Sequence, residues 1–526
     1  MSKKKKLSIR LYEALFPPRT AKRSYAASRL TNQNSNWSTA PTGANYERRT
    51  SLAALRARAR QASRDNGIVK NWLEITRSNV IGPKGIRLQS RATMPRGTMN
   101  VTLNQKIEAA WREWGHAETC TLSGKLDWKA VQRLVVTQLA CDGEFLVQMV
   151  DDPANPFGFS LKVWDVNWLD ETYNETRPGG NRVIMSVEID ANDKPVAYWL
   201  TTPSSEINFT QTRSRQRTRI AADQMIHGFL CHDDETQVRG VTWLHAGLLN
   251  AKNLQSYEEG VIQSARMAAN VFGFIEQATP DGEEFTGLEN EDGTPTQPVI
   301  DVSNLSMNLL NPGQKFTQID PKQPTQNHAA FMKTESMGLG ASLSLPYFLL
   351  FGDWEATNFS SSRGGLGEAR QMWKGLQEFI AVTLCRRVYR EWLMRAWLTP
   401  MLEISARDFE SVQNPKWIGR GWEYINPTQD AAADVMRLQN RLATPSEILA
   451  EQGVDYSDFL DRWDSDRKLA AAKGIEIDEL YNANPPASAP AEPANEPDDD
   501  ETPPADAKKK GENAYLNGKY SDEMLN

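Results

Sequence analysis

A long apolar repeat in the second half of the chain constrains the fold most. Apolar side chains recur every three or four residues through about residue 397, at Leu366, Ala369, Trp373, Leu376, Ile380, Leu384, Val388 and Trp392. This spacing predicts an amphipathic helix of about thirty residues, roughly 45 Å long. Charged side chains such as Arg370, Glu378 and Arg386 lie within it, so we do not expect it to cross a membrane.

The segment before this helix, residues 351–365, reads FGDWEATNFSSSRGG. Its glycines allow backbone angles that other residues resist, and its Asn and Ser side chains compete with regular structure for backbone hydrogen bonds. We therefore predict a polar loop between two firm elements, a common position for functional residues. Its hydroxyls and Arg363 could contact a nucleic-acid backbone. From the residues alone, an ordinary polar surface connection is the favoured interpretation.

Length and composition describe a globular protein of two or three domains. The chain has 526 residues, of which 40% are hydrophobic and 24% charged. No apolar run is long enough for a membrane helix, and the basic N-terminus lacks the apolar core of a signal peptide, so we expect the cytoplasm. The four cysteines are scattered without a CxxC pair, which indicates neither a disulfide framework nor a zinc ribbon.

Charge is unevenly distributed along the chain. The first seventy residues are strongly basic, although the formal net charge is −7. This end could be an arm for nucleic acid or an acidic partner, or simply a solvated basic face. A net acidic chain argues against tight gripping of DNA, because that affinity comes largely from neutralised phosphates.

Periodicity and turn signals predict a mixed α+β fold. In the first half we expect helices at 51–80 with a break at Asn66-Gly67, at 104–114, and at 127–142 with Asp127 as the N-cap. We also expect strands at 86–88, 145–150, 161–164 and 225–230, a hairpin of strands 183–189 and 196–201, and an exposed loop at 204–223. In the second half we expect helices at 245–271 and 327–341 around a β-rich insertion at 272–320, and helical segments between 427 and 472 with a break at Thr444-Pro445. The Pro-rich acidic end is expected to be disordered.

The motifs of common enzymes are missing from the sequence. It contains no GxxxxGK[ST], HExxH or GxSxG motif and no Rossmann glycine pattern, so we expect no catalytic residues, cofactor or metal. Two weak patterns compete with structural interpretations. The run His227-x3-Cys231-His232-Asp233-Asp234 is favoured as an ordinary strand end over a metal site. Asp142-Gly143-Glu144 is favoured as a capped turn over an acid–base pair.

Several short segments occur in an ordered set. They are Ala140-Cys141-Asp142-Gly143-Glu144, Asp193-Lys194-Pro195-Val196-Ala197-Tyr198, Arg239-Gly240-Val241-Thr242-Trp243-Leu244, Leu345-Pro346, Gly352-Asp353, Asn358-Phe359-Ser360-Ser361-Ser362-Arg363 and Trp422-Glu423-Tyr424-Ile425-Asn426-Pro427. The set resembles the portal proteins of lambda-like tailed phages between about Ser51 and Gly474. Each segment is weak alone, and their order and spacing make the resemblance specific.

The resemblance implies a portal fold assembled as a ring, typically of twelve copies. It divides the chain into a basic extended arm (1–50), an α+β wing (51–244), a first stem helix (245–271), a β-rich clip (272–320), a second stem helix (321–344), a tunnel loop (345–365), a long wing helix (366–426), a helical crown (427–481) and a disordered acidic tail (482–526). Small residues near both stem ends, such as Ala265, Gly338 and Gly340, would let identical helices crowd around an axis.

The resemblance also implies a function at one capsid vertex of the virion, after assembly in the host cytoplasm. Double-stranded DNA would pass through the ring during packaging and ejection. The implied partners are the terminase large subunit, the major capsid and scaffold proteins, and a head-completion adaptor, with no membrane. We expect the tunnel loop to face the DNA through Asn358, Ser360, Ser361, Ser362 and Arg363.

Two other classes remain open from the residues. A head–tail connector or adaptor also forms rings, but such chains are usually much shorter. A DNA-processing enzyme subunit would need a cluster of acidic metal ligands, and the sequence shows no such cluster.

Overall fold

The computed structural model describes residues 42–94, 99–203, 213–270, 274–275, 299–302, 305–309, 327–354 and 359–473. The chain divides into two units, Met1–Tyr456 and Ser457–Asn526. The described part of the second unit is almost entirely helix α14 (Tyr456–Ala472), on which the rings of Phe459 and Trp463 lie 6.0 Å apart. The predicted disordered tail, 482–526, lies outside the described residues.

The described part of the first unit contains five helices before its two larger sheets: α2 (Ala44–Asp65), α3 (Gly67–Val80), α4 (Val101–Trp114), α5 (Ala117–Cys120) and α6 (Trp128–Asp142). The predicted break after α2 is confirmed, because the Asn66 side chain accepts hydrogen bonds from the first backbone N–H groups of α3. The predicted cap of α6 is confirmed too, since Asp127 accepts from the Ala130 N–H at 2.6 Å. The predicted boundary of the extended arm, residue 50, lies too late in the sequence. Helix α2 already begins at Ala44, where Asn45 bonds to the backbone of Thr236 and Val238.

Two antiparallel sheets follow. The first has the order β3-β2-β9, from β2 (Glu144–Asp151), β3 (Phe159–Trp164) and β9 (Met225–Phe229). Its three strands were predicted, and their order was not. The second has the order β4-β5-β6-β7-β8, from β4 (Glu175–Thr176), β5 (Arg182–Ile184), β6 (Val187–Ile189), β7 (Pro195–Pro203) and β8 (Arg213–Ala221). Short 3₁₀ turns occur at Val166–Trp168 and Ala222–Gln224.

Two predictions for this region were wrong. Residues 213–221 form strand β8 rather than an exposed loop, because pairing with β7 orders a sequence that is polar except for Ile220 and Ala221 at its end. The predicted strand 183–189 is split into β5 and β6 by a turn at Met185 and Ser186, whose φ angles are 47° and 69°.

The predicted long helix is confirmed and extends further than expected. Helix α10 (Phe359–Ile380) continues through a π-helical segment (Ala381–Cys385) into α11 (Arg386–Leu398). Its buried face packs into a core rich in aromatic rings. Trp111 is central to that core, with ring centroids 4.7 Å from Trp114, 5.0 Å from Trp392 and 5.6 Å from Tyr389. Edge-on and tilted rings at such distances pack favourably.

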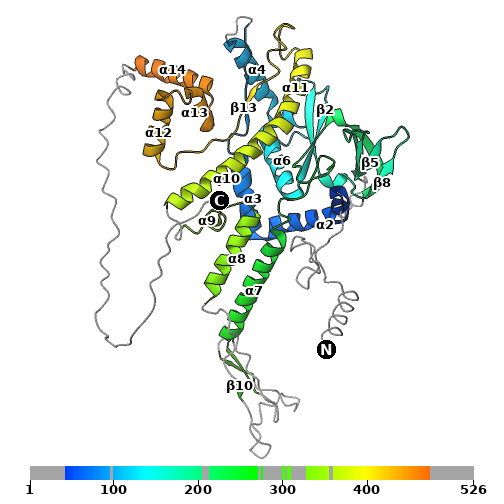
Figure 1. Cartoon of the computed structure of the whole chain (residues 1–526), viewed down its shortest axis with the longest axis vertical. Helices are drawn as coiled ribbons and strands as arrows, with labels where there is room; N and C mark the ends of the chain where they lie inside the picture. Colours follow the sequence, from blue (N-terminus) through cyan, green and yellow to red (C-terminus); the bar gives the residue numbers. More distant parts are fainter. Residues whose placement is uncertain are drawn as a thin grey trace, which may run out of the picture. The chain divides into compact units, whose positions relative to one another are not determined.

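Two helices, α7 (Leu248–Asn270) and α8 (His328–Ser342), lie side by side away from the core (Figure 1). The Tyr257 hydroxyl lies 3.2 Å from His328 Nδ1, and the Tyr257 and Phe331 rings are 5.1 Å apart. In the sequence between these two helices, three strands form a sheet of order β10-β12-β11: β10 (Phe274–Ile275), β11 (Val299–Val302) and β12 (Leu305–Leu309). The β-rich character predicted for 272–320 is confirmed at these strands, and the rest lies outside the described residues.

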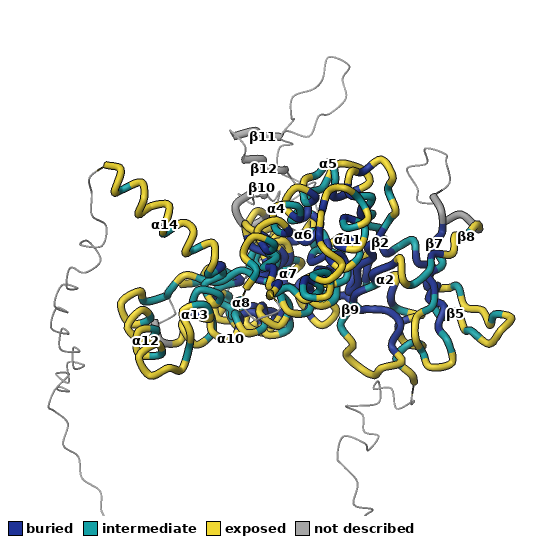
Figure 2. Tube along the Cα trace, turned by 90° about the horizontal axis from the view of Figure 1, so that it is seen from above, coloured by how far each residue is buried: buried dark blue, intermediate teal, exposed yellow. Residues whose placement is uncertain are grey.

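After the long helix, β13 (Lys416–Ile418) pairs with β1 (Arg87–Gln89), and helices α12 (Pro427–Gln439) and α13 (Pro445–Glu451) follow. The predicted break at Thr444-Pro445 is confirmed by a capping box between Thr444 and Glu447. Helix α12 buries no residue, and it is coloured as exposed along most of its length in Figure 2. None of the described helices is both long and apolar enough to span a bilayer.

Candidate functional site

A tight turn joins α8 to the short helix α9 (Tyr347–Phe351). Ser344 takes a φ of 55°, and the Leu345 N–H donates back to the Gly340 carbonyl at 3.0 Å. A Cβ at Gly340 would also lie 3.0 Å from the Leu345 carbonyl oxygen. Gly340 was predicted to serve contact between helices of different subunits, but within the chain it already makes room for this turn. At the other end of α9, Gly352 has a φ of 71° and donates its N–H to Phe348 at 2.9 Å.

Side chains from α3 and α8 hold this region in place. The Trp72 indole N–H donates to the Leu343 carbonyl at 3.1 Å, and Asn71 donates to the Leu350 carbonyl at 2.9 Å. Lys333 of α8 lies 3.7 Å from the Asp353 carboxylate. The segment before α10 is therefore anchored at both ends of α9.

The predicted loop 351–365 is shorter than expected. Helix α10 begins at Phe359, so the loop ends no later than residue 358, and residues 355–358 lie outside the described residues. Gly365 has no positive φ and instead allows close packing: a Cβ there would lie 3.1 Å from Phe348 Cε1. Gly364 and Gly365 were expected to provide backbone angles that other residues resist, but contact between α10 and α9 explains Gly365 better.

The five predicted DNA-facing residues fall in different settings. Asn358 and the Ser360 side chain lie outside the described residues. Ser361 and Arg363 are exposed on the first turns of α10, and Ser362 is half-buried. The Arg363 guanidinium donates to the Asp430 carboxylate at 2.6 Å.

Sequence reasoning missed Asp430, which lies in the first turn of α12. Its other carboxylate oxygen accepts from the backbone N–H groups of Ile425 and Asn426 at 3.0 and 3.1 Å. Arg363 therefore joins the start of α10 to the start of α12. Only tertiary contact brings the two residues together, since 67 positions separate them.

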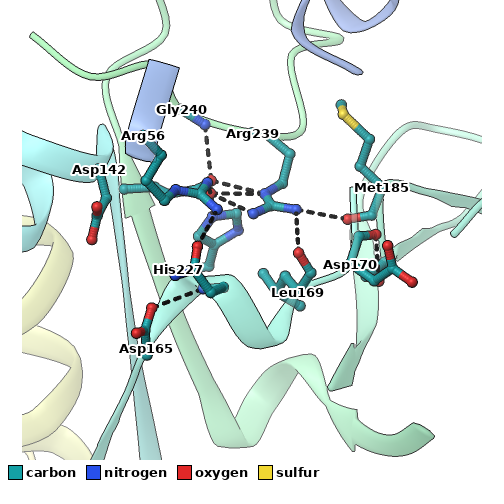
Figure 3. Close-up of polar contacts among 12 residues, drawn as sticks. Arg56, Asp142, Asp165, Leu169, Asp170, Met185, His227, Arg239 and Gly240 are labelled. Carbon is teal, nitrogen blue, oxygen red and sulfur yellow. Dashed lines mark hydrogen bonds and ion pairs between the residues drawn. The ribbon is translucent and has the colours of Figure 1, made fainter. Parts of the chain in front are cut away.

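A second cluster of charges is buried where the two sheets meet the helices (Figure 3). The Glu144 carboxylate, fully buried, lies 2.7 Å from Arg56 and 2.6 Å from Arg239. It is also 3.0 Å from His227 Nε2 and accepts from the Gly240 N–H at 2.9 Å. We call Arg56, Glu144, His227 and Arg239 the buried ion cluster.

The protonation of the cluster follows from these contacts. Burial alone would raise the pKa of Glu144, but the Arg239 guanidinium, the His227 hydrogen bond and Arg56 together hold that pKa well below its usual range. Burial lowers the pKa of His227, and the nearby positive charges of Arg239 and Arg56 lower it further, against the opposing effect of Glu144. The cluster is thus most stable with an ionised Glu144 and a neutral His227.

The buried ion cluster connects separate parts of the fold. Arg56 belongs to α2, Glu144 to β2 and His227 to β9, while Arg239 lies in the segment that leads into α7. Arg239 also donates to the carbonyls of Leu169 and Met185 at 3.3 and 3.0 Å, next to the five-stranded sheet. Apart from the buried Arg56 Nε, the charged groups of the cluster hydrogen-bond to one another and to the surrounding backbone. These contacts favour a structural role over a catalytic one.

The neighbouring carboxylate Asp142 has its own partner. It accepts two hydrogen bonds from Arg60 at 2.7 and 2.8 Å, and Arg60 also bridges to Asp165. Between the two acids, Gly143 has a φ of 85° and closes α6. The structural interpretation of Asp142-Gly143-Glu144 is therefore confirmed as a helix-ending turn. Its arginine partners went unpredicted, because they lie far away in the sequence.

The side chains of the weak metal pattern at 227–234 also have different structural partners. His227 belongs to the buried ion cluster, Asp233 pairs with Arg48, and Asp234 accepts from Thr236. In the part of the chain that the structure describes, no three His, Cys, Asp or Glu side chains are grouped to hold a metal ion.

Comparison with known proteins identifies a protein family that this chain matches. Residues 30–377 match the family model described as "Phage portal protein, lambda family". A protein named "Probable portal protein" from Halomonas phage phiHAP-1 is 29% identical over 462 residues, covering 87% of this chain and 88% of that protein.

Solved structures show a weaker similarity. A chain in "Virion of native gene transfer agent (GTA) particle" has a TM-score of 0.39 at 10% identity, covering 77% of this chain and 93% of that one. A chain in "Neck of native GTA particle computed with C12 symmetry" has a TM-score of 0.36 at 11% identity, with coverage of 77% and 93%. Both TM-scores lie below 0.5, so these similarities do not define the fold.

Proposed function

The chain belongs to the lambda family of phage portal proteins, and from that premise we propose that it forms a ring, of twelve copies, at one vertex of the capsid. It is a structural, non-enzymatic component of the virion. The observation that carries the proposal is the family match across residues 30–377, more than half of the chain. The ring would be the channel for DNA packaging and ejection and the attachment point of the tail.

The arrangement of α7, the β10-β12-β11 sheet and α8 supports the division of the subunit that we propose. The two helices would be the stem, 272–320 the clip, 51–244 and 366–426 the wing, and 427–481 the crown. The terminase large subunit and later an adaptor would dock on the ring, and capsid and scaffold proteins would surround it. A helix pair that projects from the core suits a ring in which equivalent pairs surround one axis.

A channel works best when its wall does not hold the DNA. The described side chains of α7 and α8 include three lysines or arginines (Lys252, Arg266, Lys333) and three glutamates (Glu258, Glu259, Glu335). A wall with balanced charge releases few counterions from DNA, so its affinity stays low and DNA remains free to move.

We propose that Asn358, Ser360, Ser361, Ser362 and Arg363 line the narrowest part of the channel. Serine hydroxyls and the backbone N–H groups in the first turn of a helix are donors that phosphate oxygens can accept from. The ion pair with Asp430 offsets the charge of Arg363. DNA would thus meet short polar contacts rather than an unpaired cation.

Two experiments test the proposal. Electron microscopy of the purified protein is expected to show rings with a central hole, and a uniformly monomeric, folded protein would contradict the ring. Replacing Ser360–Ser362 with tryptophans is expected to leave ring and procapsid yields unchanged while packaged DNA per particle falls. The matched control replaces three exposed residues of α12, Thr428, Gln429 and Gln439, with tryptophans, and its DNA content per particle is expected to be unchanged. Normal packaging by the serine variant would remove these residues from the channel wall.

A further inference from the structure

The ion pair between Arg363 and Asp430 connects α10 to α12. Arg363 lies near the start of α10, Asp430 lies in the first turn of α12, and the guanidinium donates to one carboxylate oxygen at 2.6 Å. The other oxygen of Asp430 accepts from the backbone N–H groups of Ile425 and Asn426. The backbone beside α12 therefore fixes the carboxylate in place, and the contact with Arg363 reaches across to α10.

Helix α12 depends on few contacts with the rest of the first unit. It buries no residue. Among the described residues, its side-chain hydrogen bonds other than that to Arg363 stay within residues 424–452. They join Asp434 to Tyr424 and Arg437, and Arg437 to Glu451. The Arg363–Asp430 pair is therefore an important part of what holds α12 against α10.

The following helix, α13, is attached in a different way. Ile448 of α13 is buried. The backbone of Gln452, just after α13, lies so close to Gly421 that no Cβ would fit there, and Arg87 donates to the Gly453 carbonyl. Loss of the Arg363–Asp430 pair would therefore loosen α12 and leave α13 in place.

The ion pair is open to competition from an anion in solution. The Arg363 side chain is 45% exposed, whereas that of Asp430 is 18% exposed. A guanidinium binds phosphate with the same planar set of donors that it offers a carboxylate. Because Arg363 carries a single positive charge, a phosphate that it attracts comes close to Asp430 and repels that carboxylate. Phosphate and Asp430 therefore compete for Arg363.

We propose that Arg363 and Asp430 form a latch that DNA opens: a phosphate passing the start of α10 takes the guanidinium from Asp430 and releases α12. The inference rests on the proposed channel, in which Arg363 faces the DNA. The exchange replaces one charge-assisted hydrogen bond with another, so the DNA is held only weakly. Because competition is reciprocal, Asp430 lowers the affinity of the ring for DNA to the extent that DNA opens the latch.

Asp430→Asn tests the competition in purified rings of the full-length chain. Asparagine has the shape of the carboxylate and keeps an oxygen for the N–H groups of Ile425 and Asn426, but it loses the charge that holds Arg363. Fluorescence anisotropy with a short labelled DNA duplex is expected to show an affinity about fivefold higher or more. In an Arg363→Gln background, the same Asp430→Asn change should have no effect.

The matched control is Asp434→Asn, one turn further along α12. The Asp434 side chain is 17% exposed, close to the value for Asp430, and its arginine partner is Arg437 rather than a residue of α10. This variant removes the same charge from each subunit, so its DNA affinity reports any general electrostatic effect. We expect it to match the unmodified ring.

Hydrogen exchange tests the release of α12. Adding the unlabelled duplex to unmodified rings should speed amide exchange in residues 427–439 and leave residues 445–451 unchanged. Asp430→Asn rings should show the faster exchange without DNA.

Two results would each overturn the latch. One is a DNA affinity of Asp430→Asn rings equal to that of Asp434→Asn rings, and the other is unchanged exchange in α12 when the duplex binds. Both leave the ring proposal standing. Failure of the ring itself is seen separately, as a folded protein that forms no rings.

Discussion

Replacing Glu144 by glutamine should destabilise the fold strongly, because the substitution removes one charge from the buried ion cluster and keeps the shape. Arg56 and Arg239 are 1% and 0% exposed, so neither guanidinium can be rehydrated without opening the core. Breaking a buried pair by removing one partner costs about 3–5 kcal/mol. We expect a loss of this size in the free energy of unfolding.

Urea unfolding followed by tryptophan fluorescence measures this loss, since Trp111, Trp114 and Trp392 lie in the core. The matched control is Glu188→Gln. Glu188 is also buried, but its partner Arg219 has a side chain that is 42% exposed and can return to water, so we expect a smaller loss than for Glu144→Gln. A Glu144→Gln variant within about 1 kcal/mol of the unmodified protein would refute the assigned role of the cluster.

Two further predictions concern the same region. The pKa of His227 is lowered in the fold, so the unfolded chain takes up a proton at a higher pH than the folded chain does. The contribution of neutral His227 to stability is therefore complete above about pH 6.5 and declines as the pH falls. Urea midpoints should fall from pH 8 to pH 5, and they should fall less for His227→Gln. Gly143→Ala should cost about 3 kcal/mol or more, since its Cβ would lie 2.1 Å from the Val241 carbonyl carbon. Gly124→Ala, also at positive φ but in open space, is the control, and equal losses would contradict the packing argument.

Local patterns predicted what local physics determines. The long helix, the Asp127 cap and the break at Thr444-Pro445 were all predicted, because each depends on residues a few positions apart. Strand β8 was missed, since its order comes from β7 rather than from its own polar sequence.

The functional residues follow the same rule. Arg363 could be selected from its motif, but Asp430 could not, because only the folded chain brings them together. The buried ion cluster shows the limit most clearly. Glu144 lies 88 positions from Arg56 and 95 from Arg239, and no single-sequence pattern links them.

The π-helical segment at Ala381–Cys385 sets how the two halves of the long helix are aimed. A π turn accommodates one additional residue without breaking the helix, and each residue turns the helical face by about 100°. Helix α10 contacts α3, whereas α11 contacts β3 and brings Tyr389 and Trp392 to Trp111. Deleting one residue here would swing both rings out of the core and leave α10 seated. The long helix is in effect two packing surfaces on one backbone, and their relative orientation depends on a single residue.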